Sequence, residues 1–200
     1  MDTHAEHIAD LLEERLFVEV EASGRHVHLS KEDALALFGH ELTPKSELSQ
    51  PGQFACHERV TLTGPKGSIA RVAILGPCRG ETQAEVSLTD AVALGIDVPV
   101  RLSGHLEGTP SITIEGPKGK AEGRVIVAKR HVHLRPEDAR HMGVENGQTI
   151  GIRTLTDRPV VFEGVVVRVS PSFMPRVHLD YDEANACHHK KGDLGMILHG

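Results

Sequence analysis

Two short runs with the sequence Arg-His-Val-His-Leu hold the residues of this chain with the clearest capacity for chemistry. They occupy residues 25–29 and 130–134, and an acidic, helix-opening stretch follows each. Residues two apart on a β-strand point to the same side of the sheet. Each run therefore offers two imidazoles on one face of a strand, which together could bind one metal ion. The pairs are His26 with His28 and His131 with His133.

A later strand in each half can supply a third ligand. Glu85 opens the run Glu-Val-Ser-Leu-Thr, which resembles the Arg-Val-His-Leu-Asp run around His178. A single histidine pair is more often a surface or core pair, but two copies in matched context favour ligation. The sequence predicts one metal held by His26, His28 and Glu85 and a second held by His131, His133 and His178. Zinc suits these ligands first, and cobalt, nickel or ferrous iron would also fit; three protein ligands leave the open position of a catalytic site.

Arg79 lies in a loop of glycine and proline, Leu-Gly-Pro-Cys-Arg-Gly, that leads into the strand with Glu85. A guanidinium held on such a loop near a dication suits bidentate capture of phosphate. A solvated surface arginine is the alternative. Arg25 and Arg130 precede the histidine pairs and should point away from the metal face, so we predict structural ion pairs for both.

Other reactive residue types are less well placed. Cys56-His57-Glu58 would allow a thiolate nucleophile, but no second histidine stands at a recognisable spacing. The three cysteines show no CxxC spacing, which indicates free thiols in a reducing compartment. The run Cys-His-His-Lys-Lys at 187–191 is predicted to be a solvated helix end.

The composition excludes several classes of function. The chain has 200 residues, of which 39% are hydrophobic and only 3% aromatic, and its formal net charge is −6. Few aromatic platforms and no basic excess argue against a nucleic-acid partner. The sequence shows no signal peptide and no apolar run of membrane-spanning length. We therefore expect a cytoplasmic protein with no membrane partner.

The elements that must position these residues are mostly short strands. Ser30 should cap a helix that ends at Phe38 before Gly39, and Pro136 should open its counterpart. Residues 39–58 form a polar insertion without a counterpart in the second half. The β-rich runs are 59–63, 69–75, 98–102, 111–115, 124–128, 149–153 and 160–169. Short strands at this density indicate barrels or sandwiches.

The phase of the repeat predicts the topology. Strand 124–128 closes the first unit just before the second histidine run, whereas the second unit lacks a closing strand at its end. The unused candidate is strand 17–22, so we predict that it completes the C-terminal barrel. The predicted fold is mainly β: two interleaved small barrels related by internal duplication and capped by short helices. Residues 17–24 with 129–200 form one barrel, residues 25–128 form the other, and residues 1–16 form an amphipathic helix that packs on the fold or, alternatively, targets a protein shell.

Several runs occur in the order found in a known family. The chain resembles the PduL-type phosphotransacylases, or phosphate propanoyltransferases, from about Phe17 to its C-terminus. The matching runs are RHVHLS at 25–30, QPGQFAC at 50–56, VTLTGPKG at 60–67, LGPCRGETQAEVS at 75–87, RHVHL at 130–134 and HLDYDEANA at 178–186. The resemblance implies two interleaved barrels with a two-zinc site between them, held by the six ligands named above.

The resemblance also implies roles for further residues. Arg79 would bind phosphate and take part in catalysis. The coenzyme A site would be lined by Ala22, Ser23, Gly24, Lys66, Ala73 and Asn185. Ala73 departs from the family pattern, in which that position is basic, although Arg71 stands nearby.

The implied activity is the transfer of a short acyl group, propanoyl first and acetyl second, between coenzyme A and inorganic phosphate. No side-chain nucleophile is required, so we predict direct transfer that gives an acyl phosphate and coenzyme A. The alternatives are a metal-dependent thioester hydrolase and a non-catalytic metal- or ligand-binding module. The family also implies propanediol degradation in a bacterial microcompartment lumen; a homo-oligomer and shell or cargo proteins are the corresponding partner predictions.

Overall fold

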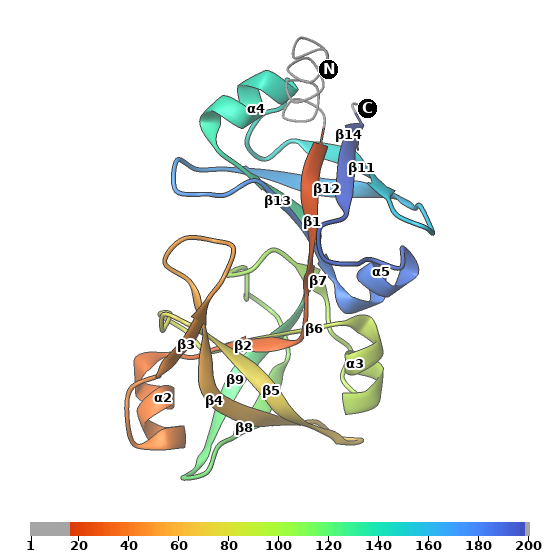
Figure 1. Cartoon of the computed structure of the whole chain (residues 1–200). Coiled ribbons are helices and arrows are strands. Elements are labelled where there is room, and N and C mark those ends of the chain that lie inside the picture. Colours follow the sequence, from red (N-terminus) through yellow and green to blue (C-terminus); the bar gives the residue numbers. More distant parts are fainter. Residues whose placement is uncertain (1–16, 199–200) are drawn as a thin grey trace. The chain divides into compact units, whose positions relative to one another are not determined.

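The computed structural model describes residues 17–198, so the helix predicted within residues 1–16 lies outside the described part. The described part of the chain separates into two compact units, one with residues 17–23 and 130–198 and one of residues 24–129. Strands dominate both units, and short helices accompany them (Figure 1). Among residues 17–198, no helix has the length and apolar character that crossing a membrane would demand. The predicted fold class, mainly β with two small barrels, is confirmed.

In the unit of residues 24–129, six strands pair into a closed ring. In order around the ring they are β4 (Phe54–Thr63), β5 (Ser68–Gly76), β2 (His26–His28), β6 (Gln83–Val86), β9 (Lys120–Ala128) and β8 (Ser111–Glu115), and β8 pairs back with β4. Two further strands lie outside this ring: β3 (Pro44–Glu47) pairs with β4, and β7 (Val100–Arg101) pairs with β9. Most of the predicted insertion is thus β3 and its flanking loops, and residues 54–58 belong to β4.

The other unit closes with a strand from the opposite end of the chain. Its ring runs β1 (Phe17–Ser23), β13 (Arg176–Asp180), β10 (His131–Leu134), β12 (Val161–Val169), β11 (Thr149–Leu155) and β14 (Leu194–Leu198). β1 pairs in parallel with β13 and antiparallel with β14, with Phe17 opposite Met196. β1 therefore occupies in this barrel the place that β9 occupies in the other, as the phase of the repeat predicts.

The helices start and stop where their capping residues predict. α2 (Lys31–Phe38) begins after Ser30, whose hydroxyl accepts from the Asp33 amide, and ends at Gly39 in the left-handed conformation. α4 (Pro136–Met142) begins with proline at its first position. α3 (Leu88–Leu94) and α5 (Tyr181–Ala186) each begin with a capping box. These helices of residues 17–198 are too short to be stable alone and depend on packing.

The arginine before each histidine pair ties its barrel strand to a helix. Arg25 binds the buried carboxylate of Asp90, the capping-box acid of α3, at 2.9 Å. Arg130 binds Glu183, the capping-box acid of α5, at 2.5 Å. The predicted structural ion pairs are confirmed. Each fixes the start of the helix that follows the strand carrying the third candidate ligand.

Each barrel has its own apolar core. Val27, Leu29, Leu62, Ile74 and other buried residues fill the unit of residues 24–129. A separate cluster, which includes Val132, Leu134, Val165 and Val177, fills the other unit. The valine between the two histidines of each pair is fully buried in the core of its unit. Because side chains alternate along a strand, this anchoring turns both histidines to the opposite face.

Two Gly-Pro-Lys-Gly turns dock against helix ends within the unit of residues 24–129. The backbone N–H of Lys66 donates to the carbonyl of Leu94 at the end of α3, and that of Lys118 donates to Leu37 near the end of α2, each at 3.0 Å. Both turns belong to one unit, so the barrel duplication does not relate them. They satisfy carbonyls that a helix end leaves without partners.

Gly64→Ala is expected to destabilise this unit, because a Cβ at residue 64 would lie 2.4 Å from the carbonyl oxygen of Leu94. A backbone atom can move away only by displacing the helix end. Overpacking of this kind costs about 1–3 kcal/mol, which urea unfolding would measure. Gly80→Ala is the matched control, since a Cβ there meets nothing within 4 Å. Equal midpoints for the two variants would contradict the proposed docking.

Candidate functional site

Register between β2 and β6 brings the first predicted triad together. His26 lies directly opposite Glu85 across this antiparallel pair, and His28 shares the face of His26. Nε2 of His26 lies 3.7 Å from Oε2 of Glu85, and Nε2 of His28 lies 3.9 Å from Oε1. All three side chains are buried. The donor atoms of the triad lie within 4.8 Å of one another, close enough to share one ion.

Backbone carbonyls set the orientation of both imidazoles in this triad. Nδ1 of His26 lies 2.8 Å from the carbonyl of Gly24, and Nδ1 of His28 lies 3.1 Å from that of Leu75. A carbonyl accepts but cannot donate, so each Nδ1 carries the proton and each Nε2 presents its lone pair. Metal-binding histidines are commonly oriented in this way.

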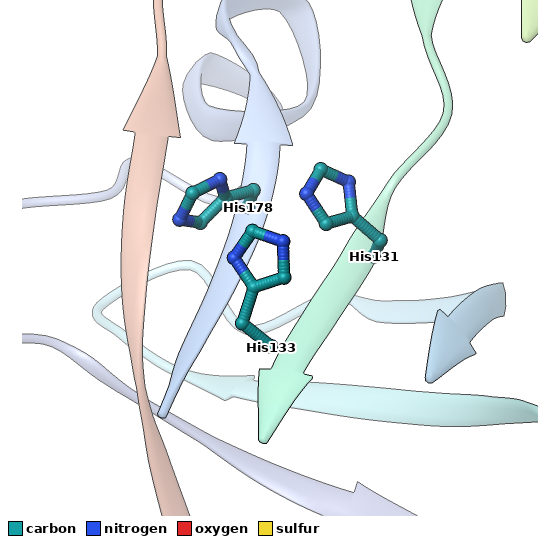
Figure 2. A group of neighbouring side chains, drawn as sticks. All are labelled: His131, His133 and His178. Atoms are coloured by element: carbon teal, nitrogen blue, oxygen red, sulfur yellow. The ribbon is translucent and has the colours of Figure 1, made fainter. Parts of the chain in front are cut away.

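The second predicted triad is built from β10 and β13 in the other unit. His131 lies directly opposite His178, in the register that places His26 opposite Glu85. Figure 2 shows the rings of His131, His133 and His178 turned toward one another from two neighbouring strands. Their centroids are 4.7, 4.8 and 5.0 Å apart, and three ring nitrogens lie within 4.8 Å.

His133 supplies the test of whether this triad fits a metal. Its ring is buried, yet neither Nδ1 nor Nε2 has a hydrogen-bond partner. A buried polar atom without a partner costs about 1–3 kcal/mol, and such groups are rare in native proteins. A bound cation would satisfy the ring. The donor set, three imidazoles, is one that zinc and its neighbours accept.

The electrostatics keep both triads ready to bind a cation. Burial, followed by the neighbouring His26 and Arg79, lowers the pKa of His28 to about 3. Burial and the neighbouring His131 likewise lower the pKa of His133 to about 2. Burial alone would raise the pKa of Glu85, but His26, His28 and a hydrogen bond from Ser103 lower it to about 2. At neutral pH the two histidines are therefore neutral and the carboxylate is ionised, as metal ligation requires.

These pKa values predict that metal-free protein loses stability as pH falls below about 6.5. Unfolded His28 and His133 take up protons near the ordinary pKa of 6.5, whereas the folded residues resist until about pH 3 and about pH 2. The unfolded state then binds more protons, so each histidine removes about 1.4 kcal/mol per pH unit from its own barrel. Urea midpoints of chelator-treated protein at pH 6 and pH 5 would measure the loss. His133→Ala should flatten the dependence, and an unchanged slope would contradict the assignment.

Arg79 lies beside the first triad. Its backbone N–H donates to the carbonyl of Leu29 at 2.8 Å, which ties the loop to the end of β2. Its side chain donates to the hydroxyl of Ser103 at 2.8 Å. Its positive charge contributes to lowering the pKa of both His28 and Glu85. The guanidinium therefore stands close enough to the triad to act on a ligand held there.

Two further residues of this site were not predicted from the sequence. Gln83 and Ser103 both donate hydrogen bonds to Oε1 of Glu85, at 2.5 and 2.6 Å. Gln83 could have been found, because it lies two residues before Glu85 on the same strand and thus on the same face. Ser103 lies in a loop, and no local pattern points to it.

The six residues predicted to contact coenzyme A lie in different places. Ala73 pairs with His26 across β2 and β5, and Gly24 bonds His26 through its carbonyl. Ala22 and Ser23 end β1, where they pair with Leu179 and Asp180. Asn185 is exposed on α5, which follows the strand with His178.

Lys66 lies at the far end of β5 from the first triad. It stands in the turn that precedes β5, whereas β5 contacts His28 near its other end, through the carbonyl of Leu75. The seven steps along the strand from Ser68 to Leu75 span about 23 Å. The side chain of Lys66 is exposed and close to Gly95, so the lysine borders the end of α3. Contact between Lys66 and coenzyme A stays a prediction.

None of the cysteines is prepared to act as a nucleophile. Burial, with the nearby Glu58, raises the pKa of Cys56 to about 11. Burial also raises the pKa of Cys78 and of Cys187. Thiols with raised pKa values are poor nucleophiles at neutral pH, so the structure gives the Cys-His-Glu run no support as a catalytic motif.

Comparison with known proteins identifies similar sequences along nearly all of the chain. A family model described as phosphate propanoyltransferase matches residues 19–190. A phosphate propanoyltransferase of Clostridioides difficile is 51% identical over 197 residues, covering 96% of this chain and 94% of its own. One from Enterococcus faecalis is 53% identical, covering 90% and 87%, and one from Thermotoga maritima is 49% identical, covering 96% and 93%.

Proposed function

The chain belongs to the phosphate propanoyltransferase family and is an acyltransferase, and on this premise we propose its reaction in detail. It transfers a short acyl group, propanoyl or acetyl, between coenzyme A and inorganic phosphate. The transfer is direct and depends on two zinc ions, one in each triad. The products are an acyl phosphate and coenzyme A. The observation that carries this proposal is the pair of triads, with five of their six side chains buried, at equivalent positions of two duplicated barrels.

The residues that would hold the ions are the six triad members, with Glu85 as the single carboxylate among five imidazoles. A zinc ion bound there would act as a Lewis acid that polarises the thioester carbonyl. Five of the six ligands are buried, which favours a desolvated site, where charge interactions are stronger than in water.

Arg79 would bind the phosphate. A guanidinium offers two parallel N–H donors that match a phosphate edge, and its charge offsets the repulsion between phosphate and other anions. The loop contacts of Arg79 to Leu29 and Ser103 hold it in place before phosphate arrives. Such preorganisation turns a bimolecular encounter into a positioned attack.

Direct transfer is favoured because no thiolate stands ready to take the acyl group. All three cysteines have raised pKa values. Phosphate held by Arg79 is then the nucleophile, and the acyl group passes from sulfur to phosphate oxygen in one exchange.

Release of coenzyme A from propanoyl-CoA and acetyl-CoA, followed with a thiol reagent, tests the proposal. We expect release that requires phosphate and that stops when the zinc is removed with a chelator. Release without phosphate would indicate a thioester hydrolase instead, and metal binding without any release would indicate a non-catalytic module. Propanediol degradation, a microcompartment location with its shell or cargo partners, and a homo-oligomer stay predictions from the family resemblance.

A further inference from the structure

The side chain of Gln83 is held in a single orientation next to the first triad. It is 1% exposed and lies on β6, opposite His28 and on the face of Glu85. Its Oε1 accepts from the backbone N–H of Gly104 at 2.9 Å. Its Nε2 therefore faces Glu85 at 2.5 Å and Ser103 at 2.9 Å. If the amide were flipped, its NH2 group would face the N–H of Gly104, donor against donor, and its oxygen would face the Glu85 carboxylate, acceptor against acceptor. The flipped orientation is therefore excluded.

The loop that carries Gly104 is shaped for this contact. Gly104 has φ of +90°, a conformation that residues with a Cβ rarely adopt. This backbone turn delivers the N–H of Gly104 and the hydroxyl of the preceding Ser103 to the same side chain.

The hydroxyl of Ser103 joins three side chains. Its oxygen accepts from Gln83 and, at 2.8 Å, from Arg79, and its single proton goes to Oε1 of Glu85 at 2.6 Å. A hydroxyl has one proton and two lone pairs, so its hydrogen-bonding capacity is used in full. One atom thus sets the position of the candidate phosphate-binding arginine relative to the candidate metal-binding carboxylate.

The two oxygens of Glu85 differ in their hydrogen bonds. Each lies near one imidazole, with Oε2 3.7 Å from Nε2 of His26 and Oε1 3.9 Å from Nε2 of His28. Oε1 in addition receives hydrogen bonds from Gln83 and Ser103. Two donors occupy the lone pairs of Oε1 that an ion would use. The carboxylate can then offer a cation one oxygen in a fixed direction.

The place equivalent to Gln83 in the second triad holds a different kind of residue. The residue two before His178 is Arg176, and it pairs with Glu19 at 2.9 Å. A neutral imidazole offers an ion one nitrogen lone pair, whereas a carboxylate offers two oxygens. A histidine ligand therefore needs no hydrogen bond to select one of two ligand atoms. The network of Gln83 and Ser103 thus contacts the one carboxylate among the six candidate ligands.

We propose that Gln83 and Ser103 are positioning residues that fix Glu85 as a one-oxygen zinc ligand through Oε2, and that Ser103 also aligns Arg79 for phosphate. This inference rests on the proposed function and adds the residues that orient its site. Residues that orient a metal ligand typically change metal affinity about 10- to 100-fold when they are removed.

The test measures zinc affinity of folded protein by competition with a chromogenic chelator, together with kcat and KM for phosphate. Gln83→Met, which keeps the size but loses both donors, should weaken one of the two zinc sites about 10- to 100-fold and leave the other unchanged. Ser103→Ala should weaken the same site and in addition raise KM for phosphate. Ser103→Thr should restore both properties, because it keeps the hydroxyl.

Ser111→Ala is the matched control, since Ser111 is exposed on β8 of the same unit. Should Gln83→Met fail to fold, Ser103→Ala carries the test, because Ser103 lies in a partly exposed loop. Wild-type zinc affinity and phosphate KM in folded Ser103→Ala would overturn the inference alone. A wild-type protein that binds no zinc, or that transfers acyl groups fully without it, would overturn the proposed function and this inference together.

Discussion

His133→Ala is expected to lower kcat for acyl transfer by about a hundred- to a thousandfold, a loss of the size seen when a main electrostatic contact to the transition state is removed. His133 is the buried ring whose two nitrogens have no hydrogen-bond partner, so its replacement breaks no hydrogen bond of the metal-free fold. Its removal leaves two imidazoles, which hold zinc far more weakly than three. Elemental analysis should show that the variant keeps the ion of the first triad and loses the other.

The control for this experiment is His141→Ala, because His141 is exposed on α4 in the same unit. It should retain both ions and full activity. A His133→Ala protein that lacks one ion and still transfers at the wild-type rate would show that the three-histidine triad has no catalytic role.

Arg79→Ala is expected to lower kcat/KM for phosphate by about a hundred- to a thousandfold, the range found for loss of one preorganised charge-stabilising donor. KM for acyl-CoA should change little, because the guanidinium is assigned to phosphate alone. Arg79→Lys should recover only part of the loss, since an ammonium keeps the charge but not the two parallel donors. Steady-state kinetics with each substrate varied in turn would separate these effects.

Arg101→Ala provides the comparison, because Arg101 is an exposed arginine of the same unit whose side chain bonds the neighbouring carbonyl of Val100. It should leave both kinetic constants unchanged. Equal losses in kcat/KM for phosphate and for acyl-CoA in Arg79→Ala would point to a general distortion of the site instead of a phosphate contact.

The features that the sequence predicted are those governed by short-range periodicity or by the repeat. Alternation along a strand placed His26 and His28 on one face, with Val27 in the core. The matched strands then predicted the partners Glu85 and His178. The phase of the duplication predicted that β1 closes the C-terminal barrel, which the pairing of Phe17 with Met196 confirms.

The features that could not be predicted depend on contacts between distant parts of the chain. Ser103 reaches Glu85 from a loop 18 residues later, and the carbonyl of Leu75 orients His28 across 47 residues. Neither contact can be recognised from a repeat period or a sequence motif. Each depends on the geometry of a loop or on the register between strands that are distant in the sequence. The Gly-Pro-Lys-Gly turns show the converse: they are alike in sequence, yet both belong to one barrel, where each docks on a different helix.

The closing of one barrel by β1 has a consequence for the order in which the chain acquires its structure on the ribosome. Residues 24–129 are continuous, so this barrel can form as soon as its last strand, β9, has emerged. β1 emerges first but must wait for β13 and β14, at residues 176–198, before both of its edges are paired. During that interval its exposed edges could instead accept β14 from another nascent chain. The length of chain between β1 and these two partners sets the waiting period, and it includes the whole of the other barrel.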